Sequence, residues 1–436
     1  MKLRDFYIQS FYDGQCCNTS LSRLKLILLH GLVAVLPLHI AYSNIVLGCY
    51  IMVSLIDYKD LRFRSLGVKT LLLQGIFYLS AIGYWYSAHP HEAGLYLERQ
   101  LLILLLPIIL PISLPLTLKQ VYPLLMTLAL SCVLAILYLF TNMLLLIHEH
   151  FGTVTANVML SGAFFNHRFS AALGIHAGYL SLYTVLGLIV VIDLYRIQSM
   201  LINKIVPWLL IVILSTGMFF LASRNTSIAL LIILALVIPF FIRTQRRIYY
   251  LLITVFIFTG LALTVYYTPF LKERFSAQLI SDIKPLKGGS EINFQNMEPR
   301  IERWKCAWDI VLKAPVWGHG TGDEIAQLKQ AYHQKGLFIS ELYDLNAHNT
   351  YLSMAIKHGF AGFIAFLMLM FVYVSWALRA RHFIYLSFLL VYLIGFYTEN
   401  LLDTNKGIVC FALLNTLLGY SVIPLAAPAK ALNLPS

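Results

Sequence analysis

The sequence predicts an all-α, polytopic integral membrane protein with about twelve transmembrane helices and a large helical loop between spans nine and ten. Of its 436 residues, 59% are hydrophobic and only 12% are charged, and the mean hydropathy is +0.76. A soluble domain usually carries about 25% charged residues, so this chain has too few charges to cover a water-facing surface. The apolar residues also form blocks of roughly 20, the length of a membrane-crossing helix, whereas a β-barrel would show short alternating segments.

The excess of basic residues, a net charge of +12, predicts membrane orientation rather than nucleic-acid binding. The lysines and arginines lie between hydrophobic blocks and are not gathered on one soluble face. The six cysteines form no CxxC pair and no Cys/His spacing of a metal site, so we expect no disulfide, metal or cofactor. The first apolar block begins after a polar stretch and lacks a small-residue cleavage site, so we expect no cleavable signal peptide.

Twelve apolar blocks are read as spans. The first two are short and are expected to form a hairpin around Pro37. The fourth contains Pro107 and Pro111, which should kink it. The predicted spans are 24–41, 43–56, 66–87, 97–115, 120–147, 169–193, 204–222, 226–242, 248–267, 359–379, 382–400 and 406–424.

Short loops between these spans predict the orientation. Their lysines and arginines all fall on one side of the membrane if the N-terminus is cytoplasmic, so both termini should lie inside. This arrangement predicts three regions: spans one to nine at 1–267, a periplasmic loop domain at 268–358, and spans ten to twelve with a cytoplasmic tail at 359–436. The basic residues used are Lys59, Arg62, Arg64, Lys119, Arg196, Lys204, Arg243, Arg246, Arg247, Arg379 and Arg381.

The loop at 268–358 is long enough to escape the charge rule and to fold by itself. Its segment 284–296 is rich in Gly, Ser, Asn and Lys and is expected to be flexible. Pro299 fits the first position of a helix that Pro315 ends. Four apolar residues of this helix recur at helical spacing and predict one apolar face. They are Trp304, Trp308, Val311 and Leu312.

The second half of the loop predicts a glycine-rich turn and two more helices. Gly318-His319-Gly320-Thr321-Gly322 forms the turn, which is one candidate for an anion-binding nest. Asp323 should start an amphipathic helix that closes near Gly336. A third helical segment begins near His348 and continues into span ten.

Three polar places on the outer side are candidates for chemistry. Arg224 lies in a tight turn at the mouth of span eight, where an arginine that reaches lipid headgroups is the alternative. Arg300 and Arg303 share a face of the first loop helix, where a solvated helix face is the alternative. Arg300 lies in the first turn, near backbone N–H groups that favour anions such as a diphosphate.

His348 and Tyr351 form the third candidate, one helical turn apart on a shared face. A histidine with an ordinary pKa near 6.5 suits general-base catalysis. A structural histidine at a helix end is the alternative interpretation.

Together, the ordered motifs resemble the bacterial O-antigen ligase and O-antigen polymerase family over most of the chain. The Ser223-Arg224 turn, Glu399 at the end of span eleven and Gly407 opening span twelve also match that family. Lys357 is a departure, since the family often has an acidic residue there. The motifs are Arg300-x-x-x-Trp304, Pro315-x-x-Gly318-x-Gly320-x-Gly322, His348-Asn349-x-Tyr351-Leu352 and Gly359-x-x-Gly362, with Phe165-Asn166-His167-Arg168 and His176-x-x-Tyr179-Leu180-Ser181 resembling the ligase branch.

This resemblance implies a metal-independent, inverting glycan transferase at the periplasmic face of the bacterial inner membrane. Such enzymes move a polysaccharide from a polyprenyl (undecaprenyl) diphosphate carrier to an acceptor sugar hydroxyl. The acceptor is lipid A-core in the ligases and another lipid-linked repeat unit in the polymerases. The resemblance implies that Arg224, Arg300 and His348 are catalytic. Further pocket candidates that bind substrate are Arg303, His176, Tyr351, His319 and Glu399.

A lipid or solute transporter, or a flippase, is the rival class. It should place charges at mid-membrane on broken helices, often in two matching halves. Here the charged residues cluster at the ends of the spans, and the large outer loop has no counterpart in the first half. The sequence therefore favours the transferase.

Overall fold

The computed structural model describes residues 19–57, 63, 66–114, 116, 118–197, 205–242, 244–283 and 298–422. Within these ranges every regular element is a helix and there is no strand, so the all-α prediction is confirmed there. The segment 284–296, expected to be flexible, lies outside the described residues. So do several residues used for the orientation, namely Lys59, Arg62, Arg64, Lys204 and Arg243.

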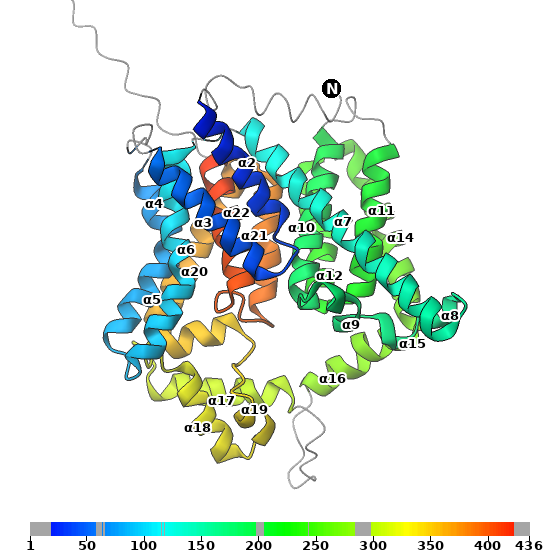
Figure 1. Cartoon of the computed structure of the whole chain (residues 1–436). Helices are drawn as coiled ribbons and strands as arrows, with labels where there is room; N and C mark the ends of the chain where they lie inside the picture. The colour runs from blue at the N-terminus through cyan, green and yellow to red at the C-terminus, as the bar shows by residue number, and fades with distance from the viewer. Residues whose placement is uncertain are drawn as a thin grey trace, which may run out of the picture.

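Helices α2 to α6 lie toward one side of the bundle, and α7 crosses it diagonally to the other side (Figure 1). The predicted hairpin is present, because α2 and α3 pack against each other around the turn that contains Pro37. The predicted span at 66–87 is divided at Gln74 into α4 and α5. These helices are α2 (Ser20–Ala34), α3 (Ile40–Ile56), α4 (Val68–Leu73), α5 (Gly75–Trp85), α6 (Pro90–Ser113) and α7 (Leu118–Phe151).

The middle of the chain contributes long helices that alternate with short turns. The span predicted from residue 169 begins only at Ala177, because Gly174, at a φ of +60°, interrupts the helical backbone before it. The elements are α8 (Ala156–Met159), η3 (Gly162–Phe164), α9 (His167–Ser170), η4 (Ala171–Leu173), α10 (Ala177–Ile197), α11 (Ile205–Leu221), α12 (Arg224–Ile232), η5 (Ile233–Val237), α13 (Ile238–Phe241) and α14 (Thr244–Tyr267).

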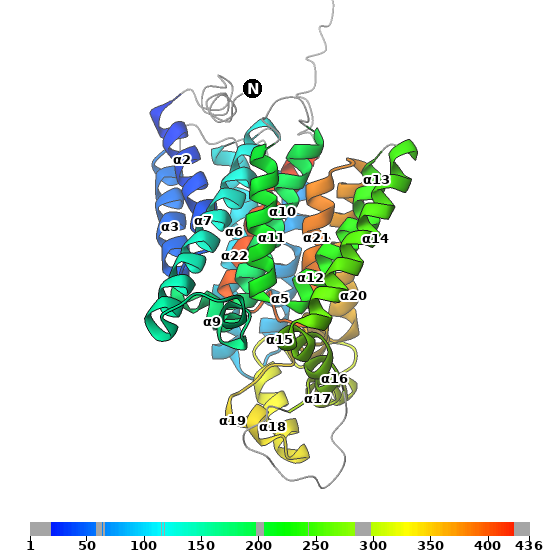
Figure 2. The same cartoon turned by 90° about the vertical axis from the view of Figure 1, so that its right-hand side faces the viewer.

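The last part supplies the loop helices and the centre of the bundle. Helices α17 to α19 gather beyond one end of the bundle, opposite the end where α2 begins (Figures 1 and 2). We call this end the loop side. The elements are α15 (Pro269–Lys272), η6 (Glu273–Ala277), α16 (Gln278–Ile283), α17 (Arg300–Lys313), α18 (Glu324–Lys335), α19 (Phe338–Leu342), α20 (Thr350–Arg379), α21 (Phe383–Phe396) and α22 (Asn405–Val422).

Six helices of the described residues are long and apolar enough to cross a membrane. Three shorter apolar helices accompany them, at Ile40–Ile56, Ile205–Leu221 and Phe383–Phe396. The chain is therefore a multi-pass membrane protein, while the number twelve stays a prediction. The six are Pro90–Ser113, Gln120–Phe151, Ala177–Arg196, Arg224–Phe241, Tyr250–Tyr267 and Thr350–Arg379.

Two apolar cores form, and the smaller one belongs to the loop helices. The large core runs through the bundle, including α2, α7, α10, α21 and α22. The small core lies between α17, α18 and the start of α20, and it contains Val311, Leu328, Tyr332 and Ile356. As predicted, Asp323 stands at the N-cap position of α18, although its side chain makes no capping hydrogen bond, and Gly336 ends the helix at a φ of +67°.

A break in α20 explains the glycine motif of the loop. Gly359 has a φ of +61° and interrupts the helix. The chain after α17 fills the break, because Phe360 N donates to Pro315 O (2.7 Å) and His319 N donates to Ile356 O (2.9 Å). A Cβ at Gly318 would lie 2.5 Å from Gly359 N, so this approach requires glycine.

The same contacts overturn the anion-nest interpretation of the turn. The N–H groups of His319, Gly320 and Thr321 already donate to backbone oxygens of Ile356, Lys357 and Gly83. A nest must leave such N–H groups free for the anion. In this protein the glycine turn joins the loop helices to α20.

Candidate functional site

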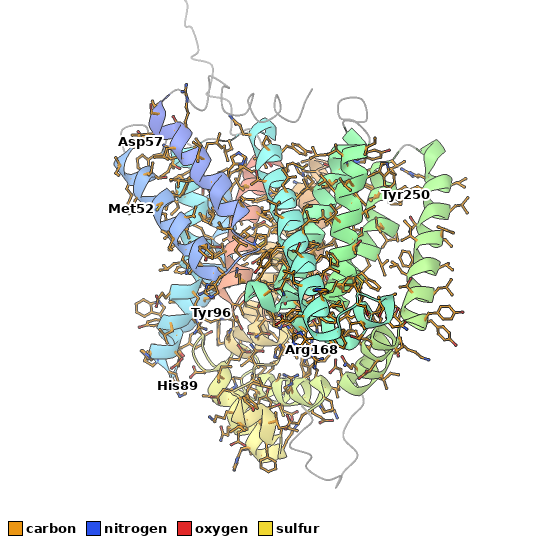
Figure 3. The ribbon with its side chains drawn as sticks, turned by 45° about the vertical axis from the view of Figure 1, so that its right-hand side comes forward. Met52, Asp57, His89, Tyr96, Arg168 and Tyr250 are labelled. Carbon is orange, nitrogen blue, oxygen red and sulfur yellow. The ribbon has the colours of Figure 1, made fainter. Side chains whose placement is uncertain are left out.

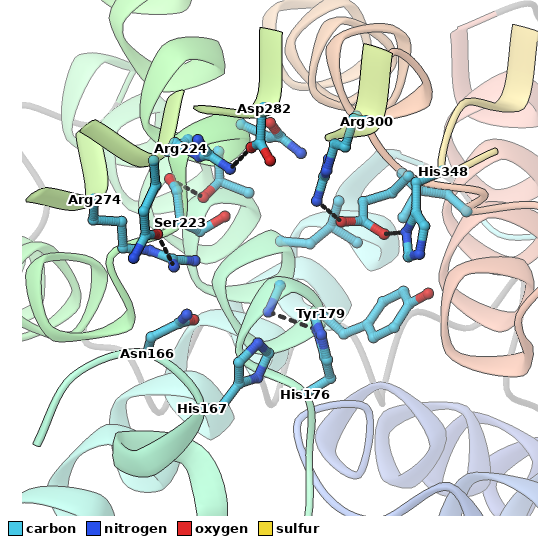
Figure 4. Close-up of a pocket in the computed structure, with 18 of the residues that line it drawn as sticks. Asn166, His167, His176, Tyr179, Ser223, Arg224, Arg274, Asp282, Arg300 and His348 are labelled. Carbon is cyan, nitrogen blue, oxygen red and sulfur yellow. Dashed lines mark hydrogen bonds and ion pairs between the residues drawn. The ribbon is translucent and has the colours of Figure 1, made fainter. Parts of the chain in front are cut away.

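A cavity of about 360 Å³ opens at the loop side of the bundle. Its walls come from the starts of α10, α12 and α17, from η6 and α16, and from the turns before α20 and after α21. Figure 4 shows arginines along one side of the cavity and His167 and His176 across from them. Six predicted site residues line it, and they are Arg224, Arg300, Arg303, His348, His176 and Glu399.

Arg224 points into this cavity from the first position of α12. A sharp turn places it there, because Ala222 has a φ of +44° and Ser223 is extended. Its Nη2 donates to Asp282 Oδ2 at 2.6 Å, and its Nη1 is buried with no hydrogen-bond partner in the part of the chain that the structure describes. The side chain is only 17% exposed, so it does not extend along the protein surface toward headgroups.

Arg300 holds the matching position at the start of α17. Its Nη1 donates to Thr398 O at 2.8 Å, and its Nη2 lies 3.5 Å from Glu399 Oε1. Arg300 and Glu399 are far apart in the sequence, but they lie close together in the structure because α17 folds beneath the end of α21. The guanidinium therefore reaches the cavity beside the Glu399 carboxylate.

Arg303, one turn further along α17, is buried, and its interpretation as a solvated residue is wrong. It is 2% exposed because it shares the buried face of the helix with Cys306, Ala307 and Ile310. Its Nε and Nη1 have no hydrogen-bond partner among the described residues. Burial lowers the pKa of this guanidinium below its ordinary value.

His348 and Glu399 form a hydrogen-bonded pair at the end of the cavity. The His348 Nδ1 lies 3.1 Å from Glu399 Oε2. With the proton on Nδ1, the ring donates to the carboxylate and leaves the Nε2 lone pair free. Burial by itself would raise the pKa of the Glu399 carboxyl, but the hydrogen bond from His348 and the charge of Arg300 hold it below its ordinary value. The carboxylate is thus ionised at neutral pH.

The backbone of His348 is unusual and is fixed by its neighbours. Its φ is +47°, a region that few residues other than glycine adopt. Its N–H donates to Asn346 Oδ1 at 2.9 Å, and the next residue, Asn349, caps α20 by accepting from Leu352 N at 3.1 Å. Asn349 N in turn donates to Asn400 Oδ1 at 2.7 Å. These contacts aim the imidazole at Glu399.

Arg274 is a cavity residue that sequence reasoning missed. It lies on η6, and its Nε donates to Ala222 O at 2.7 Å, in the turn that places Arg224. Burial, with added repulsion from Arg224 and Arg300, lowers its pKa to about 10, so it stays cationic at neutral pH. In the sequence it stands between charged neighbours after span nine and resembles an ordinary surface residue.

His167 and His176 face these arginines across the cavity, with ring centroids 4.1 Å apart. His176 Nδ1 accepts from Gly178 N at 3.1 Å, which leaves Nε2 as the donor toward the cavity in the neutral ring. Burial lowers the pKa of both rings. His167 stood in the motif that resembles the ligase branch, but only His176 was singled out.

Two predicted pocket residues, Tyr351 and His319, do not line the cavity. The Tyr351 hydroxyl donates to Leu393 O at 2.8 Å, and its ring packs against Phe363 and Phe396. The His319 Nε2 lies 3.1 Å from Ile310 O within the loop helices. No group of three or more His, Cys, Asp or Glu side chains that could hold a metal is found in the part of the chain that the structure describes.

A buried charge cluster lies behind the His348–Glu399 pair. Lys357 is 2% exposed, and its Nζ lies 2.8 Å from Glu324 Oε2 and 3.1 Å from Asp403 Oδ1. It also lies 3.9 Å from the ring centroid of Tyr96, on the loop-side half of α6 (Figure 3). Asn400 Nδ2 donates to Asp403 Oδ2 at 2.7 Å. Because Asn400 also anchors Asn349, the cluster connects the loop helices to the backbone of His348.

We expect Lys357→Met to destabilise the protein by about 3–5 kcal/mol, because it leaves two buried carboxylates without their cation. The matched control is Lys329→Met, which removes an exposed pair with Asp344 and should leave the thermal midpoint unchanged. Thermal unfolding of both purified variants in detergent measures the difference. Equal midpoints for Lys357→Met and the parent protein would show that the cluster does not stabilise the fold.

A family model described as O-antigen ligase matches residues 209–367. The match starts within α11 and ends within α20, so it includes Arg224, Arg274, Arg300, Arg303 and His348. His176 and Glu399 lie outside it. A search of curated proteins finds no match for the chain.

Proposed function

Because the chain belongs to the O-antigen ligase family, which it matches over residues 209–367, we propose that it transfers a polysaccharide from a polyprenyl diphosphate carrier to an acceptor sugar hydroxyl. The acceptor is lipid A-core, and the reaction takes place on the periplasmic side of the bacterial inner membrane. In this proposal 268–358 is the periplasmic domain. It lies between transmembrane spans at 1–267 and a region at 359–436 that holds further spans and a cytoplasmic tail. No metal or nucleotide takes part.

One observation supports this function above the others: the cavity gathers more arginines than carboxylates, and buried N–H groups of two of these arginines have no acceptor among the described residues. Four arginines line it against three carboxylates, Asp282, Glu298 and Glu399. Within the described ranges, buried guanidinium N–H groups of Arg224 and Arg303 lack acceptors, which costs free energy unless a ligand supplies them. Arg224 and Arg300 also begin helices, where the backbone dipole favours anions over cations. A diphosphate matches this environment.

The arginines then stabilise the leaving group. As the bond between the sugar C1 and the phosphate oxygen breaks, negative charge builds on the diphosphate. Guanidinium groups fixed in place before the reaction stabilise that charge without reorganisation. The free energy for transfer is already stored in the diphosphate linkage, so no further activation is needed.

His348 is the base for the acceptor. Its Nε2 takes the proton of the acceptor hydroxyl as the oxygen attacks C1, forming the new glycosidic bond. Glu399 accepts the Nδ1 hydrogen bond and stabilises the imidazolium that results. Attack from the face opposite the diphosphate inverts the anomeric centre. The lipid tail of the carrier lies among the membrane helices throughout.

Lipopolysaccharide from a deletion strain tests this function. Loss of a ligase should leave bare lipid A-core while lipid-linked polymer accumulates. A band of core carrying a single repeat unit would instead identify a polymerase. Unchanged transfer in membranes, together with carrier trapped on the cytoplasmic side, would indicate a transporter. Complementation with the intact gene is the control for each outcome.

A further inference from the structure

The apolar face that the sequence predicts for α17 is divided in the structure. Val311 is fully buried in the small core, and Trp304 donates from Nε1 to Ala347 O. Trp308 and Leu312 are 47% and 55% exposed. Half of the predicted face therefore has no cover among the described residues.

These two side chains belong to a larger exposed apolar surface at the loop side. Three more members, Trp85, Val316 and Trp317, are each more than half exposed, and Trp85 is 86% exposed. The end of α5 is tied to the loop here, because the Tyr86 hydroxyl donates to Trp317 O at 2.7 Å. We call the set the tryptophan patch, and it consists of Trp85, Trp308, Leu312, Val316 and Trp317.

The tryptophan patch continues the outward surface of the membrane helices. Val316 O accepts from Ala361 N at 3.2 Å, and the Trp308 ring packs edge-on against Phe360, which begins the upper part of α20. From there α20 exposes an apolar stripe at helical spacing, formed by Ile364, Met368 and Phe371. At about 1.5 Å per residue, Ile364 lies only one turn from Phe360.

Charged residues border the other side of the patch. Lys305, Asp309 and Lys313 are spaced four residues apart along α17, adjacent to Trp308 and Leu312, and all three are exposed. Asp309 pairs with Lys335 of α18, and Lys305 pairs with Glu302. Helix α17 lies crosswise beneath the bundle helices (Figure 1). The apolar stripe and the charged stripe run along α17, so both lie parallel to the membrane plane.

We propose that the tryptophan patch inserts into the headgroup region of the membrane leaflet on the loop side. Tryptophan prefers this region because its ring is amphipathic, and helices with such paired stripes lie in the interface plane. The lipid surface is the occupant because the patch is continuous with the lipid-facing stripe of α20. Part of the loop domain is then embedded in the membrane rather than held above it.

Insertion has a consequence for the cavity. Helix α17 has its patch residues in its C-terminal half and Arg300 and Arg303 in its first turn. A helix of 14 residues is rigid over about 20 Å, so an anchored C-terminal half fixes the depth of both arginines relative to the membrane surface. The lipid contact itself does not depend on the reaction that the cavity performs.

Tryptophan fluorescence in reconstituted vesicles tests the insertion. One variant keeps only Trp317 and another keeps only Trp304, with the other tryptophans replaced by phenylalanine. Phosphatidylcholine brominated near the headgroup should quench most of the Trp317 emission, and iodide should quench little of it. Trp304, which packs against Tyr397, should respond to neither reagent.

Two results would overturn the proposal. Strong iodide quenching of Trp317 without quenching by bromolipid would place the patch in water. If neither reagent quenches the Trp317 emission, another part of the protein covers the tryptophan patch. If the multiple variants do not fold, single Trp317→Phe and Trp304→Phe variants replace them. Only Trp317→Phe should then reduce the bromolipid-sensitive emission of the whole protein, and an equal reduction in both would contradict insertion.

Discussion

Replacing Arg224 or Arg300 by lysine should abolish most glycan transfer while the protein still inserts and folds. Lysine keeps the charge but loses the planar fork that can bind two phosphate oxygens at once. Loss of one preorganised group that stabilises developing charge typically costs about 10²–10³-fold in rate. Both arginines begin a helix beside the cavity, so a shorter point charge at either position cannot recover the same contacts.

The measurement is transfer from a polyprenyl-diphosphate donor to lipid A-core by purified variants. Arg379→Lys is the matched control, because Arg379 is exposed at the far end of α20 and should tolerate lysine. Arg303→Lys should also lose activity, since the structure buries this guanidinium in the cavity wall. Normal turnover by both Arg224→Lys and Arg300→Lys would mean that these arginines do not bind the diphosphate.

Replacing His348 should lower the transfer rate by about 10²–10⁴-fold, the usual contribution of a positioned general base. Glycine is the informative substitution here. His348 has a φ of +47°, which glycine adopts without strain, whereas alanine would combine the loss of the base with backbone strain. His348→Gly should therefore keep the thermal midpoint and lose the chemistry.

Rates of His348→Gly in the same transfer assay measure this loss. The control is His333→Gly on α18, where the side chain is 72% exposed and far from the cavity lining. A second readout is the transfer rate of Glu399→Gln, which should fall because a neutral amide stabilises the imidazolium less than the carboxylate does. Near-normal transfer by His348→Gly would exclude His348 as the base.

Hydrophobic patterning alone determined the all-α class and the approximate position of the helices. Runs of apolar residues predict helices in a bilayer because every backbone polar group must be satisfied within the segment. Local chemistry also fixed some ends, as at Gly336 of α18. The predicted start of this span, at residue 169, was wrong, because α10 begins only at Ala177. A single residue such as Gly174 can break a helix without changing the hydropathy of the apolar run.

Motif spacing also identified residues that the fold brings together, namely Arg224, Arg300, Arg303, His348, His176 and Glu399. It did not separate them from Tyr351 and His319, whose polar groups bind backbone oxygens away from the cavity. Helical spacing shows which residues share a face, but it contains no information on what the face touches.

Only the tertiary structure decided what each face touches. It buries Arg303, adds Arg274 to the cavity and leaves Trp308 and Leu312 uncovered. It also shows that the glycine motif fills the break in α20 at Gly359. All of these depend on contacts between segments far apart in the chain, such as Arg300 with Thr398. Sequence periodicity cannot specify those contacts, because they depend on how the loop helices dock against the end of the bundle.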